Sequence, residues 1–196
     1  TTEPALVAVT GTSTEVLREP RDLDLTSGWL PVPEQIEFPT SSPAGGPEGE
    51  LEQAHALVYP PTSPDHEAPA GERPPLVVLV HGGPTGSVRT QLQLAVAIWT
   101  SRGFTVADVD YRGSTGYGRS YRHRLRGGWG VLDVDDCVAV ARYLSSDDRS
   151  TTEQVDAERL AIRGGSAGGF TVLAAVTFHD VFSAGVVAAD WVGGGC

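Results

Sequence analysis

The sequence has no Lys, no Asn and no Met, and all 14 of its basic residues are Arg. Because position 1 is Thr1 rather than Met, we expect the chain to begin inside a longer reading frame. Two cysteines, Cys137 and Cys196, are too few for a disulfide framework and fit a reducing, cytoplasmic location. No apolar run approaches the roughly 20 residues of a membrane helix, and the first residues lack the basic start and apolar core of a signal peptide. The sequence therefore indicates neither a membrane nor export.

The formal net charge of −11 is concentrated in the first part of the chain. Residues 1–74 carry 13 acidic residues and 3 Arg, whereas residues 75–196 are close to neutral. An acidic surface repels phosphate backbones, so we expect no nucleic-acid partner. The local exception is a run of arginines, which we interpret as a solvated loop or helix face: Arg119, Arg122, Arg124 and Arg126.

Local patterns divide the first part of the chain into two segments. Residues 1–30 contain short β-like runs, at 5–9 and 15–17, separated by a turn-rich stretch. In residues 31–74, a strand at 35–38 that breaks at Pro39 is expected to form a hairpin with residues 51–59, and a Pro-rich linker follows.

In residues 75–196 the pattern changes to strands that alternate with helices. Residues 76–80 form a continuous apolar run, as expected for a strand buried on both faces. The periodicity predicts further strands at 104–109, 160–162 and 184–188, and helices at 92–101, 131–144 and 170–178. Cys137 falls on the apolar stripe of the second helix, so we expect it to be a small core residue. The alternation predicts an α/β fold, with a parallel doubly wound sheet and helices on both faces.

The strongest chemical signal is Gly164-Gly165-Ser166-Ala167-Gly168, which matches the pattern G-x-S-x-G. It lies directly between a predicted strand and a predicted helix, where a nucleophilic serine stands on a sharp turn with its hydroxyl exposed. Small neighbours let strand and helix pass closely, and the helix N-terminus favours a developing oxyanion. A phosphate-binding glycine loop would need G-x-G-x-x-G or a terminal Lys-Ser/Thr, and neither is present. The pattern predicts that Ser166 is the attacking residue of a serine hydrolase.

A second signal follows the first core strand, at His81-Gly82-Gly83-Pro84. In the α/β-hydrolase fold a loop at this place donates one of the two backbone N–H groups that hold the oxyanion. We assign this donor to Gly83 and the other to Ala167, the residue after the nucleophile. His81 ends a buried strand on the oxyanion side, so we expect its ring to brace the loop rather than to act as the base.

Four motifs in series resemble the catalytic domain of the prolyl oligopeptidase family, in the branch of bacterial acylaminoacyl-peptidases and dipeptidyl-aminopeptidases. They are residues 81–84, residues 110–118 (DYRGSTGYG), Trp129-Gly130 followed by Asp133 and Asp136, and residues 164–170. The resemblance is close over 75–185 and looser over 35–75. It implies that Arg112 and Asp136 are structural, that residues 1–30 are the end of an N-terminal β-propeller, and that the substrates are short peptides.

The catalytic acid and base are the point where the sequence departs from the family. The fold's order is Ser, then Asp, then His, yet after Ser166 only His179, Asp180 and Asp190 remain. His179 and Asp180 follow the next helix and lie at its far end, while Asp190 has no histidine to orient. His123 precedes the nucleophile on another loop. We expect a C-terminally incomplete fragment that lacks the triad Asp and His and is inactive alone.

The sequence thus predicts a serine-type peptidase that acts through an acyl-enzyme on Ser166, with no cofactor, no metal, a peptide as its partner, and no nucleic acid or membrane. A carboxylesterase for small esters shares every catalytic part seen here and stays open, as does an inactive fragment. The oligomeric state is not determined.

Overall fold

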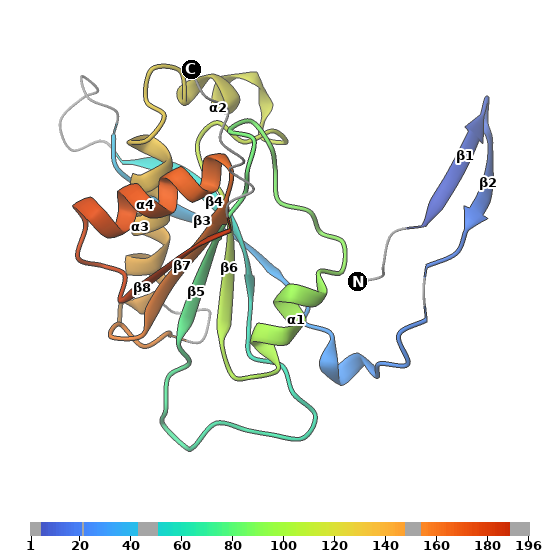
Figure 1. Cartoon of the computed structure of the whole chain (residues 1–196), viewed down its shortest axis with the longest axis horizontal. Coiled ribbons are helices and arrows are strands. Elements are labelled where there is room, and N and C mark those ends of the chain that lie inside the picture. Colours follow the sequence, from blue (N-terminus) through green and yellow to red (C-terminus); the bar gives the residue numbers. More distant parts are fainter. Residues whose placement is uncertain (1–4, 21, 43–50, 148–153, 189–196) are drawn as a thin grey trace.

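The computed structural model describes residues 5–20, 22–42, 51–147 and 154–188. Figure 1 shows one sheet covered by helices and a separate β-hairpin at the N-terminal end. Two residues considered above, Asp190 and Cys196, lie outside the described residues.

In the described residues the main sheet has six strands, in the order β3-β4-β6-β5-β7-β8. The pairs β6–β5, β5–β7 and β7–β8 are parallel, whereas β4 runs antiparallel to both β6 and β3. The strands are β3 Glu34–Thr40, β4 Glu52–Tyr59, β5 Leu76–Val80, β6 Thr105–Asp110, β7 Leu160–Gly165 and β8 Ala184–Ala188. Because parallel strands end at the same edge, the loops after β5, β6 and β7 meet there, which is where ligands bind in open α/β sheets.

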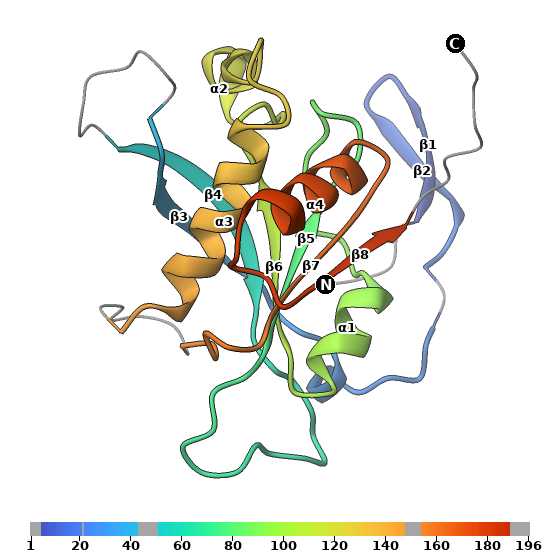
Figure 2. The same cartoon turned by 60° about the vertical axis from the view of Figure 1, so that its left-hand side comes forward.

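Helices cover both faces of this sheet, as predicted. The helices are α1 Leu94–Thr100, α2 Gly118–Arg124, α3 Leu132–Ser145 and α4 Ala167–Phe178, with a short 3₁₀ helix at Ser27–Trp29. Figures 1 and 2 show α3 and α4 together on one face and α1 on the other. The alternation along β4 explains the two cores: Ala54, Ala56 and Val58 join the larger core under α3 and α4, and Leu57 and Tyr59 join the smaller core under α1.

Several elements differ from the sequence prediction. Strand β3 does not break at Pro39 but continues to Thr40, with Pro39 opposite Gln53. It can do so because β3 is an edge strand, where the missing N–H of proline is tolerated. Helix α4 begins at Ala167, directly after the predicted nucleophile, instead of at Phe170. The sequence prediction missed α2, because a helix of 7 residues with Tyr121 as its one buried side chain has no apolar period to detect.

The N-terminal hairpin consists of β1 Leu6–Thr10 and β2 Ser13–Arg18, paired antiparallel in a sheet of their own. It stands away from the main sheet in Figure 1, and its apolar side chains are exposed, among them Val9 at 68%. A two-stranded hairpin buries too little to be stable alone. The propeller assignment for residues 1–30 stays a prediction.

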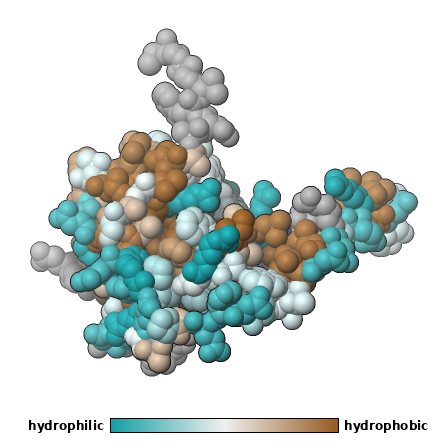
Figure 3. Space-filling view, turned by 60° about the horizontal axis from the view of Figure 1, so that its bottom comes forward, coloured by the Kyte–Doolittle hydropathy of each residue, from teal (hydrophilic) through white to brown (hydrophobic). Residues whose placement is uncertain are grey.

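The outer face of α4 is also apolar. Phe170, Leu173 and Phe178 are exposed, Phe178 at 79%. Figure 3 shows an apolar area, in brown, on the surface of the molecule. No helix within the described ranges is long and apolar enough to cross a membrane.

Candidate active site

Ser166 stands on a strained turn between β7 and α4. Its backbone has φ 54° and ψ −122°, a left-handed conformation that residues with a Cβ rarely adopt. The residue is exposed, and within the described chain its hydroxyl has no hydrogen-bond partner. The turn therefore presents the hydroxyl to solvent at the carboxyl edge of the parallel strands, as predicted.

Glycines make this turn possible by letting backbones approach one another. A Cβ on Gly168 would collide with the carbonyl oxygen of Val80 at the end of β5, and one on Gly164 would lie 2.5 Å from the carbonyl oxygen of Gly168. Residue 168 must therefore be glycine for α4 to start tightly against β5 and β7. This close packing fixes the position of Ser166.

The loop after β5 lies directly against the nucleophile turn. A Cβ on Gly82 would lie 3.3 Å from the Cβ of Ser166 and 3.0 Å from the carbonyl oxygen of Gly165. Gly83, the next residue, has φ 60°, which glycine adopts without strain. The two motifs that the sequence analysis singled out are thus neighbours in space, although 80 positions separate them.

Asp110, which the sequence analysis quoted only within a motif, anchors this loop. Its carboxylate, at the end of β6, accepts the N–H of Val88 at 2.7 Å and the hydroxyl of Tyr117 at 2.9 Å. Burial raises the pKa of Asp110, while the bonds from Val88 and Tyr117 favour its charged form. An acid as the last residue of a buried strand is the sequence signal that could have revealed this role.

His81 braces the same loop and, among the described residues, forms no hydrogen bond with Ser166. Its Nδ1 lies 3.1 Å from the carbonyl oxygen of Gly82, which can only accept, so Nδ1 carries the proton. Nε2 then accepts the hydroxyl of Ser114 at 2.8 Å, and the ring stacks on Tyr111 with centroids 4.4 Å apart. Burial lowers the pKa of His81, which keeps the ring neutral. Both nitrogens are occupied, as expected for a bracing residue.

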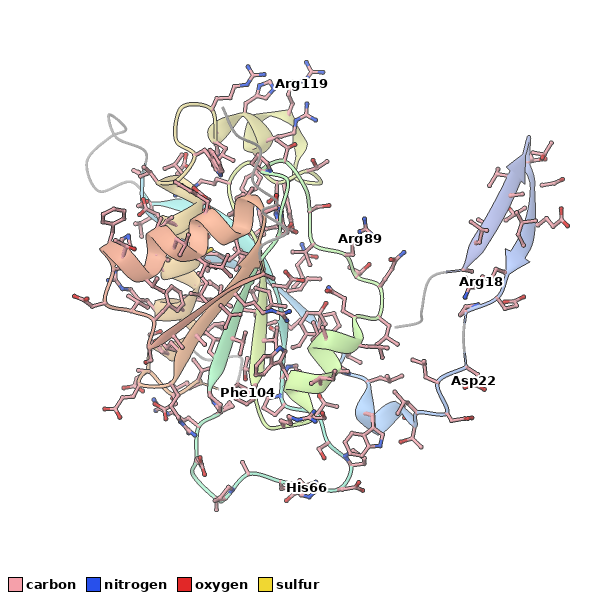
Figure 4. All side chains as sticks on the ribbon, in the orientation of Figure 1. Arg18, Asp22, His66, Arg89, Phe104 and Arg119 are labelled. Carbon is pink, nitrogen blue, oxygen red and sulfur yellow. The ribbon has the colours of Figure 1, made fainter. Side chains whose placement is uncertain are left out.

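The other histidines belong to other segments of the chain. His179 follows α4, whose 12 residues place it about 18 Å along the axis from the turn. His55 stacks on Tyr117 at 3.9 Å, and Figure 4 shows His66 at the opposite end of the molecule from Arg119 of α2. In the part of the chain that the structure describes, no histidine forms a hydrogen bond with Ser166. His123 is the next-to-last residue of α2 and lines a pocket together with Pro84 and Trp129.

The backbone N–H groups of Gly83 and Ala167, the two predicted donors, have no hydrogen-bond acceptor among the described residues. Ala167 is the first residue of α4, where helix N–H groups lack partners within the helix. Because Ser166 is the N-cap of α4, the positive end of the helix dipole lies beside it.

Buried ion pairs hold the surrounding loops. Arg112 has no exposed surface, and its guanidinium lies 2.8 Å from Asp136 and 3.0 Å from Glu52. Asp136 also accepts the backbone N–H of Arg112 at 2.7 Å, which ties the segment after β6 to α3. Asp133, one turn earlier, accepts the Gly130 N–H at 2.6 Å and the hydroxyl of Thr171 on α4. These residues position the loops and do not reach the nucleophile.

The site holds no arrangement for a metal: within the described residues, no three His, Cys, Asp or Glu side chains are grouped to bind one. An exposed serine on a strained strand-to-helix turn, at the carboxyl edge of a mostly parallel sheet, defines the α/β-hydrolase class.

Comparison with known proteins identifies the family within this class. Residues 90–192, more than half of the chain, match the profile described as "Prolyl oligopeptidase family". The chain belongs to the prolyl oligopeptidase family. It is 41% identical over 115 residues to the acylamino-acid-releasing enzyme of Mus musculus, a match that covers 58% of this chain and 14% of that enzyme. It is 35% identical over 113 residues to dipeptidyl aminopeptidase BIII of Pseudoxanthomonas mexicana, covering 57% of this chain and 16% of the relative. These relatives place the chain in the acylaminoacyl-peptidase and dipeptidyl-aminopeptidase branch.

Solved structures agree with the fold. A puromycin-hydrolyzing peptidase of Mycobacterium tuberculosis is 46% identical, with a TM-score of 0.80, over 94% of this chain and 26% of that one. A puromycin hydrolase is 44% identical, with a TM-score of 0.78, over 89% of this chain and 24% of that one. The chain spans about a quarter of the length of these structures.

Proposed function

We propose that this chain supplies the nucleophile and the oxyanion donors of a serine peptidase that acts on short peptides. Ser166 attacks the carbonyl carbon of the scissile amide, and its proton passes to a base. The carbonyl oxygen becomes an oxyanion, held by the N–H groups of Gly83 and Ala167. Collapse of the tetrahedral intermediate expels the amine and leaves an acyl-enzyme, which water hydrolyses.

The observation that carries this proposal is the exposed, unpaired hydroxyl of Ser166 on a turn with φ 54°, packed against Gly82. Membership of a peptidase family favours amides over the small esters of a carboxylesterase. Two similar proteins hydrolyse puromycin, and one puromycin hydrolase mutant was solved in complex with PGG, which supports short amide substrates.

We further propose that the chain alone reacts slowly. A serine without a base is a weak nucleophile at neutral pH, and no histidine in the described residues is hydrogen-bonded to Ser166. Oxyanion donors without a triad retain roughly 10³–10⁴ of rate enhancement over water, well below a complete site.

Fluorophosphonate labelling of the folded chain, with the adduct located by mass spectrometry, tests both parts. We expect a slow adduct on Ser166 that Ser166→Ala abolishes and that Ser120→Ala, a change at an exposed serine of α2, leaves intact. An adduct elsewhere, or none above the Ser166→Ala background, would contradict the nucleophile role. Rapid stoichiometric labelling would show that the chain contains its base.

A further inference from the structure

A pocket of about 410 Å³ opens beside the candidate active site. It is lined by the loop after β5 and by the segment from α2 to the start of α3: Pro84, Thr85, Arg122, His123, Leu125, Arg126 and Trp129. Its volume falls within the range of about 300–1,000 Å³ typical of small-molecule sites.

The chain order on one side and a ring contact on the other connect this pocket to the nucleophile turn. Pro84 and Thr85 directly follow Gly83, the proposed oxyanion donor. On the other side, the ring of Trp129 packs against that of Phe170, with centroids 5.0 Å apart. Phe170 lies one turn into α4, and its N–H donates to the carbonyl oxygen of Ser166. A short peptide held at Ser166 can therefore extend into the pocket.

Two arginines line the pocket. Arg122 and Arg126 are exposed, and neither forms an ion pair with another described residue. Their neighbours have other roles: Arg124 lies 3.7 Å from Glu52 and over the ring of Tyr121, and Arg112 is buried against Asp136. In a chain with a net charge of −11, two unpaired guanidinium groups beside one pocket form a local site for an anion.

The apolar part of the lining indicates which kind of anion fits the pocket. Leu125 is 6% exposed and forms a fixed apolar wall, while Trp129 is 49% exposed and offers an aromatic face. A guanidinium binds a carboxylate through two parallel hydrogen bonds, and an aromatic ring packs on an apolar side chain. The combination fits a carboxylate that has an apolar group beside it.

We propose that this pocket is a substrate subsite that binds a carboxylate of a short peptide, with Arg122 and Arg126 as its ligands and Leu125 and Trp129 packing on the adjacent apolar side chain. This inference rests on the proposed function, since it assigns the substrate class of the same site. The carboxylate can be the peptide C-terminus or an acidic side chain, and both sources share the chemistry of Arg recognition.

Arginine footprinting of the full chain tests this without requiring turnover. Phenylglyoxal modifies accessible guanidinium groups, and mass spectrometry reports the rate at each arginine. The probes are acetyl-Ala-Phe with a free C-terminus, its C-terminal amide, and acetyl-Ala-Glu amide, which carries its only carboxylate on the side chain. Arg119, exposed on α2 but outside the pocket lining, is the internal control.

We expect the peptide acid to slow the modification of Arg122 and Arg126 at least fivefold, while Arg119 reacts at an unchanged rate. The amide should protect neither, and protection by the Glu amide would assign the side-chain source. In calorimetric titrations the acid should bind roughly tenfold more tightly than the amide. The variant Arg122→Gln/Arg126→Gln should lose this preference and Arg119→Gln should keep it, with circular dichroism confirming that both fold.

Equal protection by acid and amide, or equal protection of Arg119, would overturn the subsite. This failure is distinguishable from failure of the proposed function, because Ser166 labelling is measured separately. A chain that labels at Ser166 without protection keeps the hydrolase assignment and loses the subsite. Protection of Arg122 and Arg126 without labelling of Ser166 keeps the carboxylate pocket and overturns the nucleophile role.

Discussion

The buried pair of Arg112 and Asp136 gives the most direct test of how the loops of this site are held. Replacing Arg112 by Met keeps a long apolar side chain in a position with no exposed surface and removes only the guanidinium. The carboxylate of Asp136, which is also fully buried, then retains two donors, the hydroxyl of Thr40 at 2.7 Å and the N–H of residue 112 at 2.7 Å.

The expected magnitude follows from the geometry. Arg112 offers Asp136 its Nε–H at 3.0 Å and its Nη2 at 2.8 Å, so the substitution leaves a buried charge without its counter-ion. Breaking a buried pair from one side costs about 3–5 kcal/mol. Because domains are stable by about 5–15 kcal/mol, this loss would remove a large share of the total.

Urea unfolding followed by far-ultraviolet circular dichroism measures the change. Glu52→Gln is the control: its carboxylate also lies 3.0 Å from Arg112 but is 23% exposed, so we expect a cost of no more than about 1 kcal/mol. The double variant Arg112→Met/Asp136→Asn should cost less than the sum of the single changes, by about 2 kcal/mol, because no unpaired charge remains. A cost below about 1 kcal/mol for Arg112→Met, or simple additivity, would refute the reasoning.

Two further predictions concern β5, β6 and the nucleophile turn. Gly168→Ala would bring a methyl group against the carbonyl oxygen of Val80, so we expect the free energy of unfolding in urea to fall by about 1–3 kcal/mol and fluorophosphonate labelling of Ser166 to slow. Thr177→Ala, an exposed change in the same helix, should alter neither quantity. Labelling of Gly168→Ala at the rate of the unchanged chain would show that the turn tolerates the methyl group. Asp108 is buried on β6, and burial raises its pKa to about 6 from an ordinary value of 3.8. Between pH 3.8 and about pH 6, Asp108 therefore stays protonated in the folded chain but loses its proton in the unfolded chain. The fold is destabilised as the pH rises through this range, fully so above pH 6, and is not destabilised below pH 4. Asp108→Asn should add up to about 3 kcal/mol of stability at pH 8 and little at pH 4, and an equal gain at both pH values in urea unfolding would count against the shift.

Local sequence determined much of this fold. The apolar run of β5 and the alternation of strands and helices predicted a parallel sheet with helices on both faces, because periodicity reflects which side chains are buried. The turn at Ser166 was also predictable, since five consecutive residues contain the serine, its small neighbours and the strand–helix context. The comparisons confirm the family that four successive motifs resembled.

Tertiary structure alone decided the rest, because the remaining features join residues far apart in the chain. No local pattern shows that the carboxylate of Asp110 accepts the N–H of Val88, or that the hydroxyl of Ser114 is hydrogen-bonded to His81. The sequence also does not show that Gly82 packs against the nucleophile turn. The sequence predicted a solvated face for the arginines after Tyr117, and all four are exposed: Arg119, Arg122, Arg124 and Arg126. Only the packing of α2 beside the loop after β5 leaves two of them lining a pocket next to the proposed catalytic serine.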